Sequence, residues 1–333
     1  MMQPAWLTGL CDTEAPAVLV TVAIVEGSGP RAAGAAMAVT AGGQFDTIGG
    51  GHLELKACEI ARAMLAGGAG LERLQRFPLG PALGQCCGGV THLAFELIVD
   101  RKQLRALQER LRAGQDSIRL IPLATHAPAL LLESAGPHAD AHRSAHLSNH
   151  PLLGRTLATP INPPRNRLYL FGAGHVGAAL VQALSALPCH VTWIDEREDL
   201  FPAQLPSNVT VELTDAPEDC VEQAPAHAYF LVMTHSHALD QKLAEAILRR
   251  PALHWFGLIG SKTKRMLFEH RLASRGVDAP RIARMTCPIG LPGITGKEPA
   301  VIAASVCAQL LLAWEADRRD HPSHAASQFT ESP

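Results

Sequence analysis

The chain has 333 residues, of which 47% are hydrophobic and 18% are charged, and its formal net charge is −2. This balance excludes the strongly basic surface of a nucleic-acid-binding protein, and the length is sufficient for two domains. The longest early apolar run, residues 17–25, is too short to cross a bilayer and lacks the features of a signal peptide. We therefore expect a cytoplasmic protein with no nucleic-acid or membrane partner.

The first predicted elements are two strands joined by a glycine-rich loop. Residues 17–25 and 35–40 are apolar runs typical of strands, and the loop EGSGPRAAG lies between them at 26–34. Arg31 in this loop is a candidate anion clamp, although a solvated loop arginine is the commoner case.

A triple glycine follows the next predicted strand, residues 45–48. Gly49, Gly50 and Gly51 precede a helical pattern at 53–65. Backbone at three glycines can approach a ligand closely and present N–H groups to it. A flexible turn without a ligand is the alternative.

Two adjacent cysteines, Cys86 and Cys87, stand in the sequence LGQCCGGV at 83–90. Neighbouring cysteines make a poor structural disulfide, because the ring that they close is strained. Two thiolates on an open loop can bind a soft metal or carry a labile sulfur, although an accidental pair is the alternative. The remaining cysteines in scattered contexts are expected to be buried or idle thiols, namely Cys11, Cys58, Cys189, Cys220 and Cys307.

The composition changes after the N-terminal domain, which we place at 1–133. Residues 134–165 are dominated by small residues, prolines and histidines, and we interpret them as a mobile linker. Four histidines recur there at every fourth position and would share one face of a helix: His138, His142, His146 and His150. The prolines and glycine nearby argue against such a helix and its metal site.

The strongest pattern is RLYLFGAGHVGAALVQALSALPCHVTWIDER at 167–197, near the start of a second domain at 166–316. A buried strand runs into Gly172, Gly174 and Gly177 in the spacing G-x-G-x-x-G, and a helix and a second strand follow. These glycines permit a tight turn beside a pyrophosphate, and Asp195 can accept a hydrogen bond from a ribose. The alternative is a doubly wound sheet whose glycine turn only packs the helix.

Another loop follows the predicted strand at 228–233 and carries His235 and His237. With Asp240 these side chains can ligate a metal or relay protons. Alternatively they only line the cleft, while Thr234 or Ser236 caps the next helix.

Positive charge gathers after the predicted strand at 255–259. Lys262, Lys264 and Arg265 fall in the first turn of a helix, where they oppose the helix dipole unless an anion binds. Solvated lysines are the ordinary alternative. Lys297, before the last predicted helix, is a further anion candidate, and residues 317–333 are expected to form a disordered tail.

Taken in order, these motifs resemble those of the XdhC/CoxI family, the accessory proteins of molybdenum hydroxylases. The matching segments span both domains: GSGPR, DTIGGGHLE, LGQCCGGV, FGAGHVG, VTWIDER, VMTHSHALD, GLIGSKTKR and CPIGLPGITGKEPAVIA. The second departs from the family pattern, with Asp46 where glycine is frequent. The expected fold class is α/β, with a C-terminal Rossmann-like doubly wound parallel sheet and an N-terminal α+β domain.

The resemblance implies a homodimeric maturation chaperone rather than an enzyme. Such a protein binds the molybdenum cofactor (molybdopterin) and supports its sulfuration with a cysteine desulfurase. It then delivers the cofactor to the molybdenum-binding subunit of xanthine dehydrogenase. The residues expected to contact the cofactor are Arg31, Gly49, Gly50, Gly51, Gln85, Cys86, Cys87, Gly172, Gly174, His175, Gly177, Asp195, His235, His237, Lys262, Arg265 and Lys297, with the metal at Cys86 and Cys87.

Two other functions stay open at this point. The intact dinucleotide fingerprint is also that of an NAD(P)-dependent oxidoreductase, and a nucleotide can occupy the Rossmann crevice. The group of His235, His237 and Asp240 is compatible with a metal hydrolase.

Overall fold

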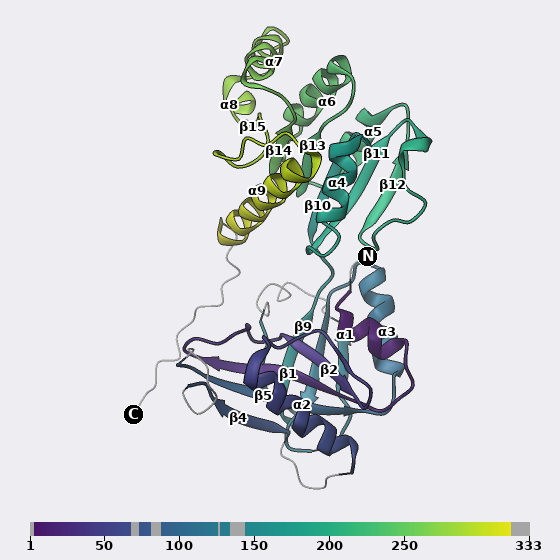
Figure 1. The fold of residues 1–333 in the computed structure, drawn as a ribbon, viewed down its shortest axis with the longest axis vertical. Helices are drawn as coiled ribbons and strands as arrows, with labels where there is room; N and C mark the ends of the chain where they lie inside the picture. The colour runs from purple at the N-terminus through teal and green to yellow at the C-terminus, as the bar shows by residue number, and fades with distance from the viewer. Residues whose placement is uncertain (1–2, 68–72, 81–87, 126, 134–143, 321–333) are drawn as a thin grey trace. The chain divides into compact units, whose positions relative to one another are not determined.

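The computed structural model describes residues 3–67, 73–80, 88–125, 127–133 and 144–320 (Figure 1). They form two compact units, whose main spans are Gln3–Pro163 and Pro164–Pro322.

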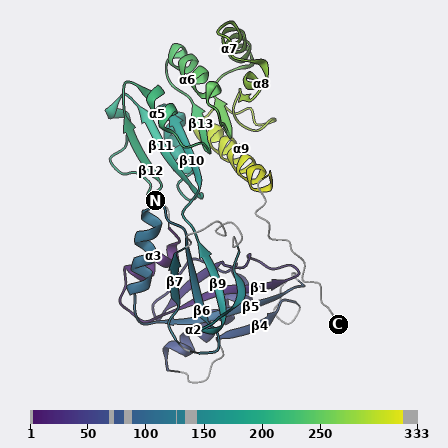
Figure 2. The ribbon, with the colours of Figure 1, turned by 180° about the vertical axis from the view of Figure 1, so that it is seen from behind.

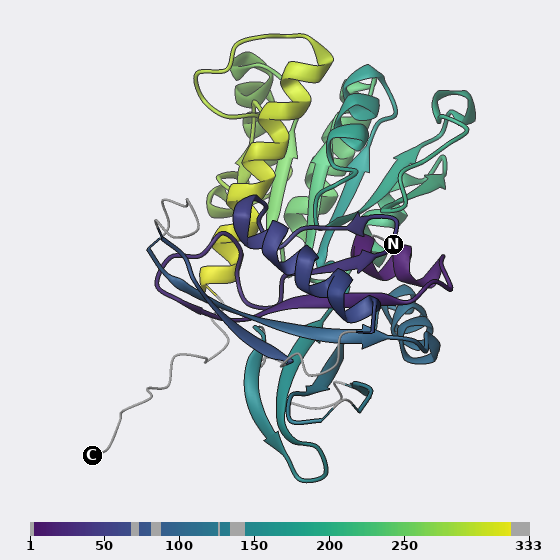
Figure 3. The ribbon, with the colours of Figure 1, turned by 60° about the horizontal axis from the view of Figure 1, so that its bottom comes forward.

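The N-terminal unit is built on a five-stranded antiparallel sheet with the order β3-β2-β1-β5-β4. Its strands are β1 Ala17–Glu26, β2 Ala36–Thr40, β3 Gln44–Phe45, β4 Leu74–Pro78 and β5 Val90–Ile98. Helix α2, Gly51–Leu65, lies across one face of the sheet (Figure 3). Alternate residues of β1, such as Val18 and Val20, pack there against Leu53 and Ala57 of the helix.

The opposite face of this sheet packs against two short helices and a second sheet. The helices are α1 Ala5–Cys11 and α3 Lys102–Arg112. The second sheet is antiparallel, with the order β7-β6-β9-β8 (Figure 2). Its strands are β6 Ser117–Pro122, β7 Leu130–Glu133, β8 His146–His150 and β9 Gly154–Ile161. Antiparallel sheets with helices confirm the predicted α+β class for this unit.

The linker predicted at 134–165 is wrong for residues 146–161, which form the hairpin of β8 and β9. Leu157 is fully buried in the core. The alternating apolar residues of this segment favour a strand, whereas its proline-rich composition had suggested a linker. Pro160 is tolerated because β8 pairs only as far as Ala158, which leaves β9 at an edge there. His146 and His150 lie in β8 and not on a helix, whereas His138 and His142 lie outside the described residues.

The C-terminal unit is a six-stranded parallel sheet with the order β12-β11-β10-β13-β14-β15. The strands are β10 Asn166–Phe171, β11 Cys189–Asp195, β12 Val209–Leu213, β13 Ala228–Val232, β14 Trp255–Leu258 and β15 Met285–Thr286. The chain starts in the middle at β10, runs to one edge, and returns to continue from β13. This order confirms the predicted Rossmann-like, doubly wound sheet.

Helices cover both faces of the parallel sheet. On one face lie α4 His175–Ala183 and α9 Pro299–Asp320, whose Leu180 and Leu310 share one core. The other face carries α5 Pro217–Gln223, α6 His237–Arg249, α7 Lys262–Ser274 and α8 Ala279–Ile282. A short 3₁₀ turn, η2 Glu198–Leu200, follows β11.

Helix α9 also corrects the predicted tail. The helix continues to Asp320, and the carboxylate of Asp317 accepts a hydrogen bond from the Tyr229 hydroxyl. Its Oδ2 also lies 2.7 Å from Nδ1 of His254. The C-terminal end of α9 therefore contacts Tyr229 in β13 and the residue just before β14. By length and composition alone, Pro299–Asp317 could cross a membrane, yet its Leu310 and Trp314 are buried in the core.

Candidate functional site

Three of the sequence motifs meet at one end of β1 and β5 in the N-terminal unit. A Cβ on Gly89, just before β5, would lie 2.3 Å from the Ser28 carbonyl oxygen and 2.5 Å from that of Glu26. A Cβ on Gly49 would lie 2.5 Å from the Cβ of Pro30. Gly49 of the triple glycine and Gly89 after the cysteine pair therefore each pack closely on the loop after β1 because they lack side chains.

Glu54, in the first turn of α2, fixes the triple-glycine loop. Its carboxylate accepts hydrogen bonds from Gln44 Nε2 at 2.8 Å, Thr47 Oγ1 at 2.5 Å and the amides of Ile48 and Gly50, both at 3.1 Å. Burial by itself raises the pKa of this carboxyl, but the hydrogen bonds outweigh it and hold the pKa below its ordinary value. We did not predict this role, although an acid in the first turn of a helix is a known signal.

The predicted N-terminal site residues fall on this cluster of loops. Gly49, Gly50 and Gly51 all have positive φ, at 121°, 74° and 65°. Arg31 is exposed, and its Cγ would lie 3.3 Å from a Cβ on Gly49. No partner for the Arg31 guanidinium occurs among the residues that the structure describes. The predicted contacts Gln85, Cys86 and Cys87 lie outside those residues.

In the C-terminal unit the glycine spacing is required by packing. Gly172 has φ +114°, and a Cβ there would lie 2.4 Å from the Met233 carbonyl oxygen. A Cβ on Gly177 would lie 2.3 Å from the Gly172 carbonyl oxygen, which accepts a hydrogen bond from Trp193. Gly174 is different: it precedes α4 at an exposed position with open space above it.

The N terminus of α4 is consequently open to a ligand. Gly174 is its N-cap and offers no side-chain hydrogen bond to the first amides. His175, the first residue of the helix, is exposed. Free amides at a helix N terminus favour a phosphate or another anion.

Asp195 does not offer its carboxylate to a ribose in this structure. The Ala173 amide donates to Oδ2 at 2.7 Å, and Arg197 donates from Nη2 to Oδ2 at 2.9 Å and from Nε to Oδ1 at 2.8 Å. The Arg197 amide also donates to Oδ1 at 3.2 Å. Burial raises the pKa of Asp195, but these bonds lower it more, so the carboxylate stays charged. The predicted ribose contact therefore requires that Arg197 be displaced.

A small cavity lies beside Asp195, lined also by Gly172, Asp215, Thr234 and His235. Its volume of about 30 Å³ has room for water but not for a nucleotide base. His235 and Asp195 thus line one small cavity.

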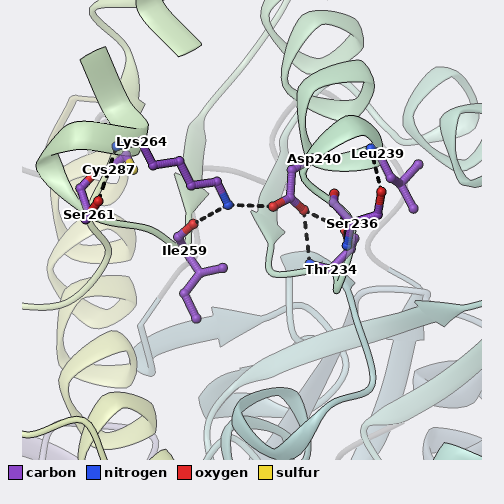
Figure 4. Close-up of polar contacts among 8 residues, drawn as sticks. All are labelled: Thr234, Ser236, Leu239, Asp240, Ile259, Ser261, Lys264 and Cys287. Atoms are coloured by element: carbon purple, nitrogen blue, oxygen red, sulfur yellow. Dashed lines mark hydrogen bonds and ion pairs between the residues drawn. The ribbon is translucent and has the colours of Figure 1, made fainter. Parts of the chain in front are cut away.

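A buried ion pair joins the first turns of α6 and α7, the helices that follow β13 and β14 (Figure 4). Lys264 Nζ lies 2.6 Å from Asp240 Oδ2 and donates to the Ile259 carbonyl at 2.8 Å. The second oxygen of Asp240 accepts hydrogen bonds from the Thr234 hydroxyl at 2.7 Å and amide at 3.1 Å. The side chains of Asp240 and Lys264 are only 1% and 11% exposed, so solvent screens their attraction little. The pair therefore links the N-terminal turns of the two helices.

In this arrangement Asp240 is not available as a third metal ligand beside His235 and His237. Asp240 is committed to Lys264 and Thr234, while His235 and His237 are exposed. Within the described ranges, no group of three His, Cys, Asp or Glu side chains is placed to hold a metal ion. Ser236 instead caps α6 by accepting a hydrogen bond from the Leu239 amide, the alternative that the sequence had left open.

Only part of the predicted positive cluster at α7 is available to an anion. Lys264 is paired with Asp240, and Arg265 donates to Glu269 at 2.7 Å and to the Cys287 carbonyl at 3.1 Å. Lys262 is exposed and has no partner among the described residues, as is also true of Lys297. The anion hypothesis therefore rests on Lys262 and Lys297 and no longer on Arg265.

The described cysteines are poor metal ligands because burial keeps them protonated. Burial raises the pKa of Cys189 to about 12 and that of Cys307 to about 11. Burial also raises the pKa of the remaining described thiols, Cys11, Cys58, Cys220 and Cys287. Cys58, Cys189 and Cys307 are buried, as expected, whereas Cys11 and Cys220 are half-buried.

Comparison with known proteins links both units to one family. The XdhC Rossmann domain matches residues 168–310, and the XdhC and CoxI family matches residues 10–77. A probable xanthine dehydrogenase subunit from Bacillus subtilis (strain 168) is 26% identical over 328 residues, covering 92% of this chain and 95% of that protein.

Two further similarities are narrower. The uncharacterized protein YqeB of Escherichia coli (strain K12) is 32% identical over 148 residues, 44% of this chain. The match spans only 27% of that relative's length. The crystal structure of a xanthine dehydrogenase from Bacillus halodurans superimposes with a TM-score of 0.72 over 98% of this chain and 97% of that one. At 24% identity, this likeness shows a shared fold.

Proposed function

Because the chain belongs to the XdhC and CoxI family, we propose that it is an accessory protein in the maturation of a xanthine dehydrogenase. In this role it binds the molybdenum cofactor as cargo, supports sulfuration of the metal with sulfur from a cysteine desulfurase, and delivers the product to the molybdenum-binding subunit. The name of the Bacillus subtilis relative supports the choice of enzyme. We further propose that the protein acts in the cytoplasm as a homodimer.

The observation that carries this proposal is that Gly49 and Gly89 both pack on the loop that carries Arg31. The cofactor is a phosphorylated pterin whose metal is held by soft sulfur ligands, so it needs amides, a cation and a soft donor. A Cβ on Gly50 would meet no atom within 4 Å, so the space beside this residue is open, although its amide already donates to Glu54. Arg31 supplies a positive charge beside Gly49. The described residues therefore fit an anionic cargo.

The soft donor is proposed to come from Cys86 and Cys87. The six cysteines that the structure describes are held as protonated thiols by burial, which makes them weak ligands. Gly89, which closely follows the cysteine pair, is packed against the loop that carries Arg31. This packing supports a role for the pair near the same loops.

The Rossmann crevice is proposed to bind a phosphate of the cargo rather than NAD(P). The strand order and the glycine spacing favour a nucleotide, and the open N terminus of α4 suits a phosphate. However, the carboxylate of Asp195 is bound on both oxygens by Arg197 and the Ala173 amide. A ribose diol has no free acceptor there, which disfavours the oxidoreductase alternative.

The proposal is tested by purifying the full chain from a host that makes the cofactor. Bound molybdenum is measured by elemental analysis, and bound pterin by fluorescence after oxidation. We expect both in the wild-type protein and a loss in the Cys86→Ser, Cys87→Ser double variant. Cys307→Ser, at a buried protonated thiol, is the matched control and should retain the cofactor. Absence of pterin from the wild type, or full retention in the double variant, would contradict the proposal.

A further inference from the structure

A groove with a volume of about 460 Å³ lies between α6 and α7 in the C-terminal unit. Its lining comes from the first two turns of α6 and from the end of α7, namely Ala238, Gln241, Lys242, Arg271, Ser274 and Arg275. These six residues define the basic groove. Gln241 is buried and the other five are exposed, so the groove is open to solvent.

The carboxylates of α6 and α7 are all paired with cations. The two helices contain three acids: Asp240, Glu245 and Glu269. Asp240 binds Lys264 inside the fold, and Glu269 lies 2.7 Å from Arg265. Glu245 is the one acid beside the basic groove, because it contacts Arg275.

Both oxygens of Glu245 are occupied by arginines. Arg275 donates from Nη1 to Oε2 at 2.8 Å, and Arg249 donates from Nη2 to Oε1 at 3.0 Å. The hydrogen bond from Arg275 lowers the pKa of Glu245, so the carboxylate is charged at neutral pH. One carboxylate against two guanidinium groups leaves one positive charge in excess.

Lys242 and Arg271 add two further positive charges to the lining. Both side chains are exposed, and neither makes an ion pair or hydrogen bond within the described part of the chain. Together with the cluster around Glu245, they leave three positive charges in excess on a chain whose net charge is −2. A local excess of like charge attracts groups of opposite charge.

We propose that the basic groove docks an acidic segment of a partner protein. Its cations are carried by long, exposed side chains, which suits electrostatic docking that steers association and is sensitive to salt. A small phosphorylated ligand fits less well, because no cation of the lining is enclosed. In addition, α7 contributes its C-terminal turn, which carries partial negative charge.

The groove begins next to the candidate site along the chain. Ala238 comes three residues after His235, which lines the small cavity beside Asp195. A docked segment would therefore be held next to the loop that carries His235 and His237. The inference does not depend on the proposed cargo, because it uses only residues outside the candidate site.

The test is a fluorescence-anisotropy titration of the full chain with a labelled peptide of about ten glutamates at about 20 mM salt. We expect saturable binding that weakens at least about tenfold at about 0.15 M salt, and no binding of an uncharged peptide of equal length. Inorganic phosphate should compete no better than chloride at the same ionic strength. Lack of saturation at low salt, or displacement specific to phosphate, would overturn the proposal.

Variants then test the residues of the groove. The Lys242→Gln, Arg271→Gln variant should bind the peptide about fivefold to tenfold more weakly, because two ionic contacts are lost. Lys102→Gln, Arg112→Gln removes the same charge from exposed positions of α3 and is the matched control. An equal loss in this control would show that net charge alone is responsible, and would overturn the proposal.

A second variant adds charge instead of removing it. Ala238→Glu places an acid in the first turn of α6, which the helix dipole favours, so folding is not impaired. The added carboxylate should weaken peptide binding about threefold or more by repulsion. Unchanged binding in both this variant and Lys242→Gln, Arg271→Gln would exclude the groove.

Carbodiimide cross-linking locates the bound peptide directly. The reagent joins a glutamate carboxyl to a lysine amine, and mass spectrometry of the digest identifies the lysine. We expect Lys242 to carry most of the peptide, whereas adducts mainly at Lys262 or Lys297 would place the acidic segment elsewhere and overturn the proposal. Lys242→Gln, Arg271→Gln should retain as much cofactor as the wild type, so this test and that of the proposed function fail independently.

Discussion

At the level of single residues, Glu54 has the most sharply defined role in the N-terminal loops. Its pKa is lowered because four hydrogen bonds outweigh the effect of burial. A carboxyl whose folded-state pKa is lowered stabilises the fold above its unfolded pKa of about 4.3. That stabilisation is lost as the pH falls through the folded-state value.

We expect Glu54→Gln to lower the free energy of unfolding by about 1 kcal/mol at about pH 7, a modest figure because the carboxylate is partly solvated. Near pH 3 the difference from wild type should shrink. Urea unfolding at both pH values measures this. Glu59→Gln, at an exposed residue of the same helix, should leave stability unchanged. An equal deficit at both pH values would show that the charge is not responsible.

Arg197 controls whether Asp195 can receive a nucleotide. The wild-type chain should not bind NAD measurably in a fluorescence titration, because the guanidinium occupies both carboxylate oxygens. Arg197→Ala should expose the carboxylate and gain NAD affinity by about tenfold or more. Adding Asp195→Asn to this variant should remove the gain. Tight NAD binding by the wild type would restore the oxidoreductase alternative.

At the level of elements, the ion pair of Asp240 and Lys264 joins α6 to α7. Removing one partner of a buried pair leaves an uncompensated charge. We therefore expect Asp240→Asn to reduce the free energy of unfolding by about 3–5 kcal/mol. Glu245→Gln disrupts the more exposed ion pair with Arg275 and should cost less than about 1 kcal/mol. Chemical denaturation of both variants makes the comparison, and similar losses would refute a structural role for the buried pair.

Elements with a strong hydrophobic period were predictable from the sequence. The strand, glycine turn, helix and strand over 167–195 are present as predicted, because local pattern and burial agree. Strand β15, Met285–Thr286, was missed because two residues are too few to show an alternation of apolar and polar side chains. The hairpin of β8 and β9 was missed because its stability comes from pairing with β6, which composition does not reveal.

The glycines of the candidate site were predictable from the sequence. The ion-pair partners of its charged residues were predictable only where the two residues are close in sequence. Asp195 and Arg197 are two residues apart, so this pair could have been weighed from the sequence alone. Asp240 and Lys264 are 24 positions apart and meet because β13 and β14 are neighbours in the sheet. Sequence spacing treated Lys264 as a free cation, whereas the sheet order supplies its counter-ion.

At the level of the whole molecule, each unit offers features suited to an anionic cargo. The N-terminal unit presents open space at Gly50 and the exposed side chain of Arg31. The C-terminal unit presents the open N terminus of α4, and also the exposed Lys262. In both units an acid beside these loops is internally bonded: Glu54 to loop amides and Asp195 to Arg197. In the C-terminal unit both carboxylate oxygens of Asp195 therefore already accept hydrogen bonds.

The most direct measurement is xanthine dehydrogenase activity in a host from which the gene for this chain has been deleted. We expect the dehydrogenase to accumulate as folded protein with little activity. The wild-type chain should restore that activity, and the Cys86→Ser, Cys87→Ser variant should not. Fully active, sulfurated dehydrogenase in the deleted host would contradict a role in maturation.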